Sequence, residues 1–185
     1  IGTSFTRDKS SNNYHLTQEG GHSKRRVVHS EDATGKEVSS SLAEIVRSIS
    51  NIKVLENHIC VDLVTAKGRC VGAYVLDINT NEVKTFSSGS TIIATGGASK
   101  IYLYTSNPDG SSGDGIGLAW RAGCKVENLE FNQFHPTCLY HPEAKSFLLS
   151  EALRGEGAFL INNENERFME KYDSRLELAP RDIVC

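Results

Sequence analysis

Apolar residues recur at helical spacing in one early stretch of the chain. The positions concerned are Val38, Leu42, Ile45, Val46 and Ile49. Because residues three and four apart share one face of a helix, this pattern predicts an amphipathic helix over about 35–50. Thr34 and Glu37 have the spacing of a capping box, which predicts that their side chains close the start of the helix.

From residue 52 the apolar period changes to that of strands. Turn-forming residues separate five segments rich in β-branched and aromatic residues: 52–55, 58–65, 70–77, 82–86 and 91–95. The short turns between them predict an antiparallel meander that leads into a final apolar strand. That last strand ends at Gly96 and Gly97.

The second half of the chain is more irregular. A loop rich in Ser, Asn, Asp and Gly precedes a predicted short helix over 116–122, which Gly123 should end. Further strands are predicted over about 125–131 and 158–161, the latter followed by a turn at Asn162 and Asn163. These elements predict a mixed α/β (α+β) fold, with a domain boundary between about 130 and 140.

Composition narrows the class of protein. The 185 residues carry 20 Lys and Arg against 23 Asp and Glu, a net charge of -3, whereas a nucleic-acid-binding domain is normally basic. No apolar run approaches the roughly 20 residues of a membrane span. The five cysteines form no C-x-x-C pair, which favours reduced thiols in a cytoplasmic protein. The chain opens at Ile1 and stops just after Pro180, so we expect a segment of a longer protein.

Two glycine-rich segments have the chemistry to approach a ligand. Thr95, Gly96 and Gly97 end a predicted strand, and Asp114 opens a predicted helix between two glycines. Glycine lets backbone come close to a ligand, and the free N–H groups of a helix start suit phosphate or sugar oxygens. Taken alone, each segment is more often an ordinary turn. Neither is a P-loop or a dinucleotide-binding fingerprint.

Polar residues after position 130 suggest an anion site. His135, Cys138 and His141 have a spacing that could bind a metal, but Pro136 and Pro142 interrupt any helix that would align them, so no metal site is predicted. A histidine before proline in such a loop is at least as suited to donate a hydrogen bond to a carbonyl oxygen or to an anion.

Arginine is the side chain suited to bidentate binding of a carboxylate. Arg154, beside Ser150 and Glu151, and Arg181 could together hold a dicarboxylate. The alternative is that these charges form surface ion pairs. Glu19, followed by two glycines, is a carboxylate that could bind a substrate ammonium group.

These segments occur together and in order. They closely resemble the flavoprotein family of succinate dehydrogenase and fumarate reductase, in particular its aspartate-oxidising branch. The segments that carry the resemblance are 19–23, 29–37, 94–100, 105–109, 112–115, 119–123, 133–137 and 151–157. The resemblance covers nearly the whole chain.

The resemblance implies roles for individual residues. It implies that FAD is the cofactor and that Asp114, Thr95, Gly96 and Gly97 lie against it. The substrate residues that it implies are His135, Ser150, Glu151 and Arg154 around the dicarboxylate, Arg181 as proton donor or acceptor, and Glu19 on the amino group. Since a guanidinium holds its proton tightly, Arg181 would work as a relay through neighbouring carboxylates.

The implied reaction is oxidation of L-aspartate to iminoaspartate, with a hydride passed to FAD and oxygen or fumarate as the final acceptor. It would begin NAD synthesis through quinolinate, with quinolinate synthase as a candidate partner. Glu19 favours aspartate, because the succinate and fumarate enzymes resemble Phe-Gly-Gly at this segment. Two alternatives remain: a fragment of a succinate dehydrogenase or fumarate reductase flavoprotein, and a non-catalytic domain of the same fold.

The resemblance also implies how the chain is divided. Residues 1–130 would be the distal part of an FAD-binding domain, and residues 131–185 the beginning of a capping domain. The family's N-terminal G-x-G-x-x-G segment does not occur in the sequence. We therefore expect the chain alone to bind FAD weakly or not at all and to have no oxidase activity.

Overall fold

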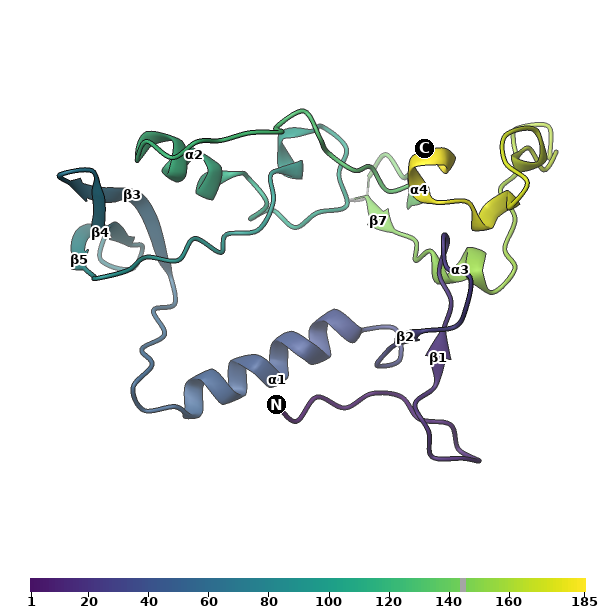
Figure 1. Cartoon of the computed structure of the whole chain (residues 1–185), viewed down its shortest axis with the longest axis horizontal. Coiled ribbons are helices and arrows are strands. Elements are labelled where there is room, and N and C mark those ends of the chain that lie inside the picture. Colours follow the sequence, from purple (N-terminus) through teal and green to yellow (C-terminus); the bar gives the residue numbers. More distant parts are fainter. Residues whose placement is uncertain (144–145) are drawn as a thin grey trace. The chain divides into compact units, whose positions relative to one another are not determined.

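The computed structural model describes residues 1–143 and 146–185 and is shown in Figure 1. It divides into two compact units. The first unit contains residues 1–54 and 133–185, and the second contains residues 55–132. Within the described ranges no helix is both long enough and apolar enough to cross a membrane.

The second unit is built on a three-stranded antiparallel sheet. Strands β3 (His58–Ala66), β4 (Arg69–Asp77) and β5 (Glu82–Ser87) lie in chain order, which confirms the three middle strands of the predicted meander (Figure 1). Lys67 and Gly68, both with positive φ, make the two-residue turn between β3 and β4. Val75 in β4 pairs with Cys60 on one side and with Lys84 on the other.

One glycine in β4 allows the strands to approach closely. Gly72 has φ +155°, and a Cβ at this position would overlap the carbonyl oxygen of Phe86 in β5. The β3–β4 pairing shifts register beside it, between Val64 and Thr65. Glycine is therefore needed where the ladder is irregular.

Three of the predicted strands are wrong. Residues 52–55, 91–95 and 125–131 form no strand. A strand exists only when its N–H and C=O groups pair with a neighbour, and none of these segments has a ladder partner within the described residues. Ile92, in one of these unpaired segments, is accordingly 89% exposed.

Helix α2 (Asp114–Arg121) lies next in the second unit and packs against β3. Gly113 precedes it with φ +82° and Gly123 follows it with φ +86°, so the predicted glycine stop is confirmed. Leu118 is its buried apolar residue. The Arg121 guanidinium binds the carboxylate of Asp62 at 3.2 Å, which ties the end of α2 to β3.

In the first unit the predicted long helix is α1 (Thr34–Ser48), but its capping box does not form. The helix begins after Ala33, and no side chain caps its first turn. Thr34 Oγ1 instead accepts a hydrogen bond from Ser30 N–H at 3.0 Å, and Glu37 Oε1 accepts one from Ser4 N–H at 3.1 Å. Both acceptors therefore fix the segments that precede the helix.

Short elements make up the rest of the first unit. They are β1 (Leu16–Thr17), β2 (Val27–Val28), β6 (Cys138–Leu139), β7 (Phe147–Leu148), α3 (Ala152–Gly155), η2 (Met169–Lys171), η3 (Leu176–Leu178) and α4 (Arg181–Val184). Met169 and Ala179 form its buried apolar centre. The strand predicted over 158–161 is reduced to a single bridge between Ile161 and Arg167, around the turn predicted at Asn162.

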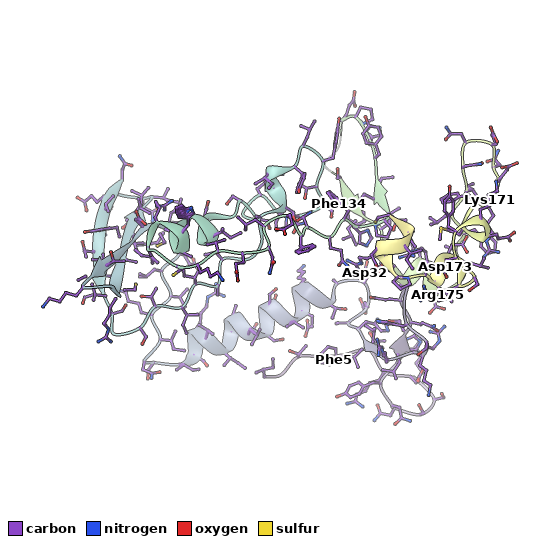
Figure 2. The ribbon with its side chains drawn as sticks, turned by 45° about the horizontal axis from the view of Figure 1, so that its top comes forward. Phe5, Asp32, Phe134, Lys171, Asp173 and Arg175 are labelled. Carbon is purple, nitrogen blue, oxygen red and sulfur yellow. The ribbon has the colours of Figure 1, made fainter. Side chains whose placement is uncertain are left out.

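Stability at low pH should depend on Asp173. Its carboxylate binds the guanidinium of Arg175 at 2.9 Å and accepts a hydrogen bond from Arg175 N–H, which lowers the pKa of Asp173 to about 2 (Figure 2). A carboxyl with a depressed pKa contributes stability above its unfolded pKa of about 3.9 and loses it as pH falls through the folded value.

We therefore expect Asp173→Asn in the full-length protein to lower the thermal midpoint at neutral pH. The difference from wild type should shrink below about pH 4 and disappear near pH 2. Asp32→Asn is the matched control, because Asp32 is exposed and forms no ion pair in the part of the chain described. A difference that persists unchanged in acid would contradict the assignment.

Candidate functional site

The first unit contains all six residues predicted around the substrate, and the side chains of three of them, Glu151, Arg154 and Arg181, bind one another. Glu19 lies in the loop after β1, His135 precedes β6, and Ser150 and Glu151 lead into α3, which carries Arg154. Arg181 opens α4. Hydrogen bonds and close backbone contacts connect these elements to one another.

Glu151 lies between two arginines. Its Oε1 accepts a hydrogen bond from Arg154 Nη2, and its Oε2 accepts one from Arg181 Nη2 at 2.5 Å. Glu151 and Arg154 are only 6% and 3% exposed, so surface ion pairing, the alternative raised by the sequence, is wrong for these two residues. Arg181 is about one third exposed, so the network has a buried end and an accessible end.

Arg154 is also fixed from the other side of its guanidinium. Its Nη1 donates to the carbonyl oxygen of Glu177 at 2.7 Å. The Glu177 carboxylate binds Arg167 Nη2 at 2.5 Å and accepts from Leu160 N–H, and the bond to Arg167 is the main reason that the pKa of Glu177 is lowered. Arg154 Nε is buried without a hydrogen-bond partner among the described residues, which leaves one donor for a ligand or a water molecule.

The glycines around Glu19 allow its loop to dock on α3. A Cβ at Gly155 would overlap the carbonyl oxygen of Gln18, and a Cβ at Gly20 would lie 2.8 Å from Arg154 Nη2. Gly21 N–H donates to the carbonyl oxygen of Leu178 at 2.8 Å. Glu19 is thus held one residue from the point where its loop meets the buried guanidinium.

His135 and Ser150 lie at the base of the β6–β7 hairpin. Thr137 and Leu149 pair there, through Leu149 N–H to Thr137 O and Thr137 Oγ1 to Leu149 O, each at 3.1 Å. His135 Nδ1 lies 2.7 Å from the carbonyl oxygen of Thr137 and 3.3 Å from Thr137 N, so the ring is held by Thr137 through Nδ1 and Nε2 is left for another partner. Ser150 Oγ accepts from Ala152 N–H and keeps its own hydrogen to donate.

A side chain that the sequence analysis did not single out links this hairpin to α4. Gln133 Oε1 accepts a hydrogen bond from Arg181 Nη1 at 3.4 Å. Glu177 and Arg167 were missed as well, because Glu177 holds Arg154 through a backbone oxygen, which leaves no signature in residue type. In the described ranges no three His, Cys, Asp or Glu side chains are placed to hold a metal ion.

The four predicted FAD residues lie in the second unit. A Cβ at Gly115 would overlap Thr95 Oγ1, and Gly113 N–H donates to the carbonyl oxygen of Gly97 at 3.2 Å, so residues 95–97 meet the start of α2. Asp114 is exposed in the first turn of α2.

This region fits part of a flavin nucleotide. Nothing stands within 4 Å of the place where a Cβ would lie on Gly96 or Gly97, and Gly96 has φ +77°. A hollow of ≈ 550 Å³ adjoins it, lined among others by Gly97, Ser99, Gly113 and Ile116. Open backbone and helix-start N–H groups are the donors that sugar and phosphate oxygens require.

Comparison with known proteins agrees with this chemistry. The sequence profile of the FAD binding domain family matches residues 2–185. The chain therefore belongs to the FAD-binding domain family, whose cofactor is FAD.

The particular relatives are L-aspartate oxidases. The chain is 57% identical over 196 residues to L-aspartate oxidase of Pseudomonas aeruginosa and 56% identical over 194 residues to that of Vibrio cholerae, covering 100% of this chain and 36% of each relative. A solved structure of E. coli quinol fumarate reductase superposes with a TM-score of 0.90 and 27% identity, over 99% of this chain and 33% of that one. The chain thus spans about a third of the length of its relatives.

Proposed function

We propose that this chain is part of a flavin-dependent L-aspartate oxidase, which converts L-aspartate to iminoaspartate with FAD as the hydride acceptor and oxygen or fumarate as the final oxidant. The reaction would begin NAD synthesis through quinolinate in the cytoplasm, and quinolinate synthase is the partner that would take the product. One observation carries the proposal: the 57% identity with an L-aspartate oxidase extends over a site where Gly20, the residue after Glu19, lies against Arg154.

The side chains suit the two carboxylates and the ammonium group of aspartate. Arginine and the Ser150 hydroxyl are donors for carboxylate oxygens, His135 is a donor when Nε2 carries a proton, and Glu19 is the carboxylate for the ammonium group. When bound, FAD supplies the hydride acceptor. The protein's share of the work is to orient the Cα–H bond and to complement the charges of the substrate.

Arg181 is proposed to move the proton. A guanidinium does not ionise freely near neutral pH, so it needs a partner that exchanges protons with it. Glu151 is that partner, since Arg181 and Arg154 both donate to its two oxygens. The bond between accessible Arg181 and the Glu151 carboxylate supports a relay in which Glu151 takes the proton that Arg181 passes on, while Arg154 holds Glu151 in place.

We also propose the division into domains. Residues 1–130 would be the distal part of the FAD-binding domain and residues 131–185 the start of the capping domain. Because the sequence contains no G-x-G-x-x-G segment to hold the pyrophosphate, the isolated chain is expected to bind FAD weakly or not at all and to be inactive. Experiments on the reaction therefore use the full-length enzyme.

Glu19→Gln in the full-length enzyme should weaken aspartate selectively. A hydrogen bond to a charged group contributes about 1.5–3 kcal/mol, so the KM for L-aspartate should rise roughly 10- to 100-fold while succinate binding changes little. Anaerobic bleaching of the oxidised flavin at varied aspartate concentrations reports the effect on aspartate, and competition by succinate against aspartate reports succinate binding. Glu44→Gln, on the exposed side of α1, is the control.

The wild-type enzyme tests the proposal itself in the same experiment. Bleaching by aspartate and not by succinate is the expected result. Bleaching by succinate alone would move the assignment to the succinate and fumarate enzymes, and a full-length protein without flavin would leave only a non-catalytic domain.

A further inference from the structure

The loop that carries Glu19 is closed at its base by a short pair of strands. Thr17 in β1 pairs with Val27 in β2, and Arg26 N–H donates to the carbonyl oxygen of Thr17 at 3.1 Å. Inside the loop, Gln18 Nε2 donates to the carbonyl oxygen of His22 at 2.6 Å and spans the turn that contains Glu19. Residues 18–26 therefore form one folded unit, here termed the Glu19 loop.

Arg25 fastens this loop to α3. Its guanidinium forms a bidentate ion pair with Glu156, in which Nη1 lies 2.7 Å from Oε1 and Nη2 lies 2.8 Å from Oε2. Nη1 also donates to the carbonyl oxygen of Leu16 at 3.3 Å. Glu156 is the residue directly after α3, and its N–H still donates to the carbonyl oxygen of Ala152. A single arginine thus joins the loop base to the end of the helix that carries Arg154.

The ion pair completes a row of contacts along α3. Arg154 lies against Gly20, Gly155 lies against Gln18, and Glu156 binds Arg25. The first two contacts are steric and allow the loop to rest on the helix, but neither prevents it from lifting away. Arg25 and Glu156 supply the directional attraction between the two segments.

We propose that the Arg25–Glu156 ion pair is a positioning clasp that holds the Glu19 loop on α3 and so sets selectivity for an amino dicarboxylate over its deamino analogue. This role rests on the proposed function, because it concerns the residue that binds the ammonium group. Arg25 and Glu156 position Glu19 and do not touch the substrate. The bond to Arg25 is also the main cause of the lowered pKa of Glu156.

The geometry sets the size of the effect. Both side chains are about half exposed, at 47% and 49%, and exposed ion pairs are usually weak. Bidentate guanidinium–carboxylate pairs are the stronger ones among exposed ion pairs. Loss of the clasp should therefore raise the KM for L-aspartate about three- to fivefold, with kcat changed less than about twofold.

The test uses four variants of the full-length holoenzyme. Arg25→Gln and Glu156→Gln should each raise the KM for aspartate and leave the dissociation constant of succinate unchanged. The double variant should be no worse than either single one, because both remove the same interaction. Arg25→Glu combined with Glu156→Arg rebuilds the pair in reverse and should bring the KM back toward the wild-type value.

Arg26→Gln is the matched control, since Arg26 is the next residue, is exposed, and forms no side-chain ion pair within the described ranges. Equal losses for aspartate and succinate, a fall in kcat at constant KM, or additive effects of the two substitutions would overturn the clasp.

Hydrogen exchange separates this proposal from the proposed function. In Glu156→Gln the amides of Gly21 and Arg26, which donate to Leu178 and Thr17, should exchange faster than in wild type. Faster exchange in a protein that does not oxidise aspartate would keep the clasp as a contact but remove its part in selectivity. Unchanged exchange would remove the clasp whatever the reaction proves to be.

Discussion

Gly155→Ala is expected to lower the activity of the full-length enzyme toward L-aspartate by about 10²-fold, because displacement of a positioning group by about 1 Å can cost that much. The new methyl group would overlap the carbonyl oxygen of Gln18, a backbone atom that cannot rotate away. The Glu19 loop would have to move off α3, and Glu19 would move with it. Steady-state kinetics with aspartate and the binding of succinate measure the effect.

Gly35→Ala is the control for this substitution. Gly35 lies in α1 with nothing within 4 Å of the added Cβ, so alanine should be neutral or stabilising by up to about 1 kcal/mol. If Gly155→Ala retained wild-type kinetics, the tight docking of the loop on α3 would be wrong.

Glu151→Gln should cost both stability and turnover. Glu151 takes a hydrogen bond from an arginine on each oxygen, and an amide keeps one acceptor but turns a second donor toward the other guanidinium. Removing one member of a buried ion pair typically costs about 3–5 kcal/mol, because the remaining charge stays buried. We therefore expect a lower thermal midpoint and a kcat reduced by at least about 10²-fold if Glu151 also relays the proton.

The effects of Glu151→Gln on stability and on turnover can be separated. Kinetics measured well below the unfolding temperature report the relay, and thermal unfolding reports the ion pair. Glu164→Gln, in the exposed turn after Ile161, provides the control for loss of a carboxylate. A variant of normal stability and normal kcat would show that the two arginines do not depend on Glu151.

Local patterns were enough to predict the elements that are stabilised locally. The apolar period located α1, the turn residues located the β3–β5 meander, and the glycines located the ends of α2. The segment 91–95 has as strong an apolar pattern but forms no strand, since pairing is a property of two segments. The capping box failed for a related reason, because Thr34 and Glu37 found acceptor roles with Ser30 and Ser4, which spacing cannot reveal.

Residue chemistry predicted the members of the site better than their surroundings. Arginine and glutamate at 151–154 indicated carboxylate binding, but the sequence left open whether the charges were on the surface. Their burial depends on Glu177 and Leu178, which reach Arg154 and the Glu19 loop through backbone oxygens. Every residue offers a backbone carbonyl oxygen, so no pattern of side chains could predict these contacts.

The docking of the Glu19 loop has a consequence for engineering. Gln18 and Gly20 allow the loop to lie on α3, Gly21 N–H binds the carbonyl oxygen of Leu178, and Arg25 pairs with Glu156. The Glu19 carboxylate takes part in none of these contacts. The side chain at position 19 can therefore be exchanged without loss of the contacts that hold the loop. Libraries that vary only this residue could retune the enzyme toward hydroxy or alkyl dicarboxylates without rebuilding the framework that carries it.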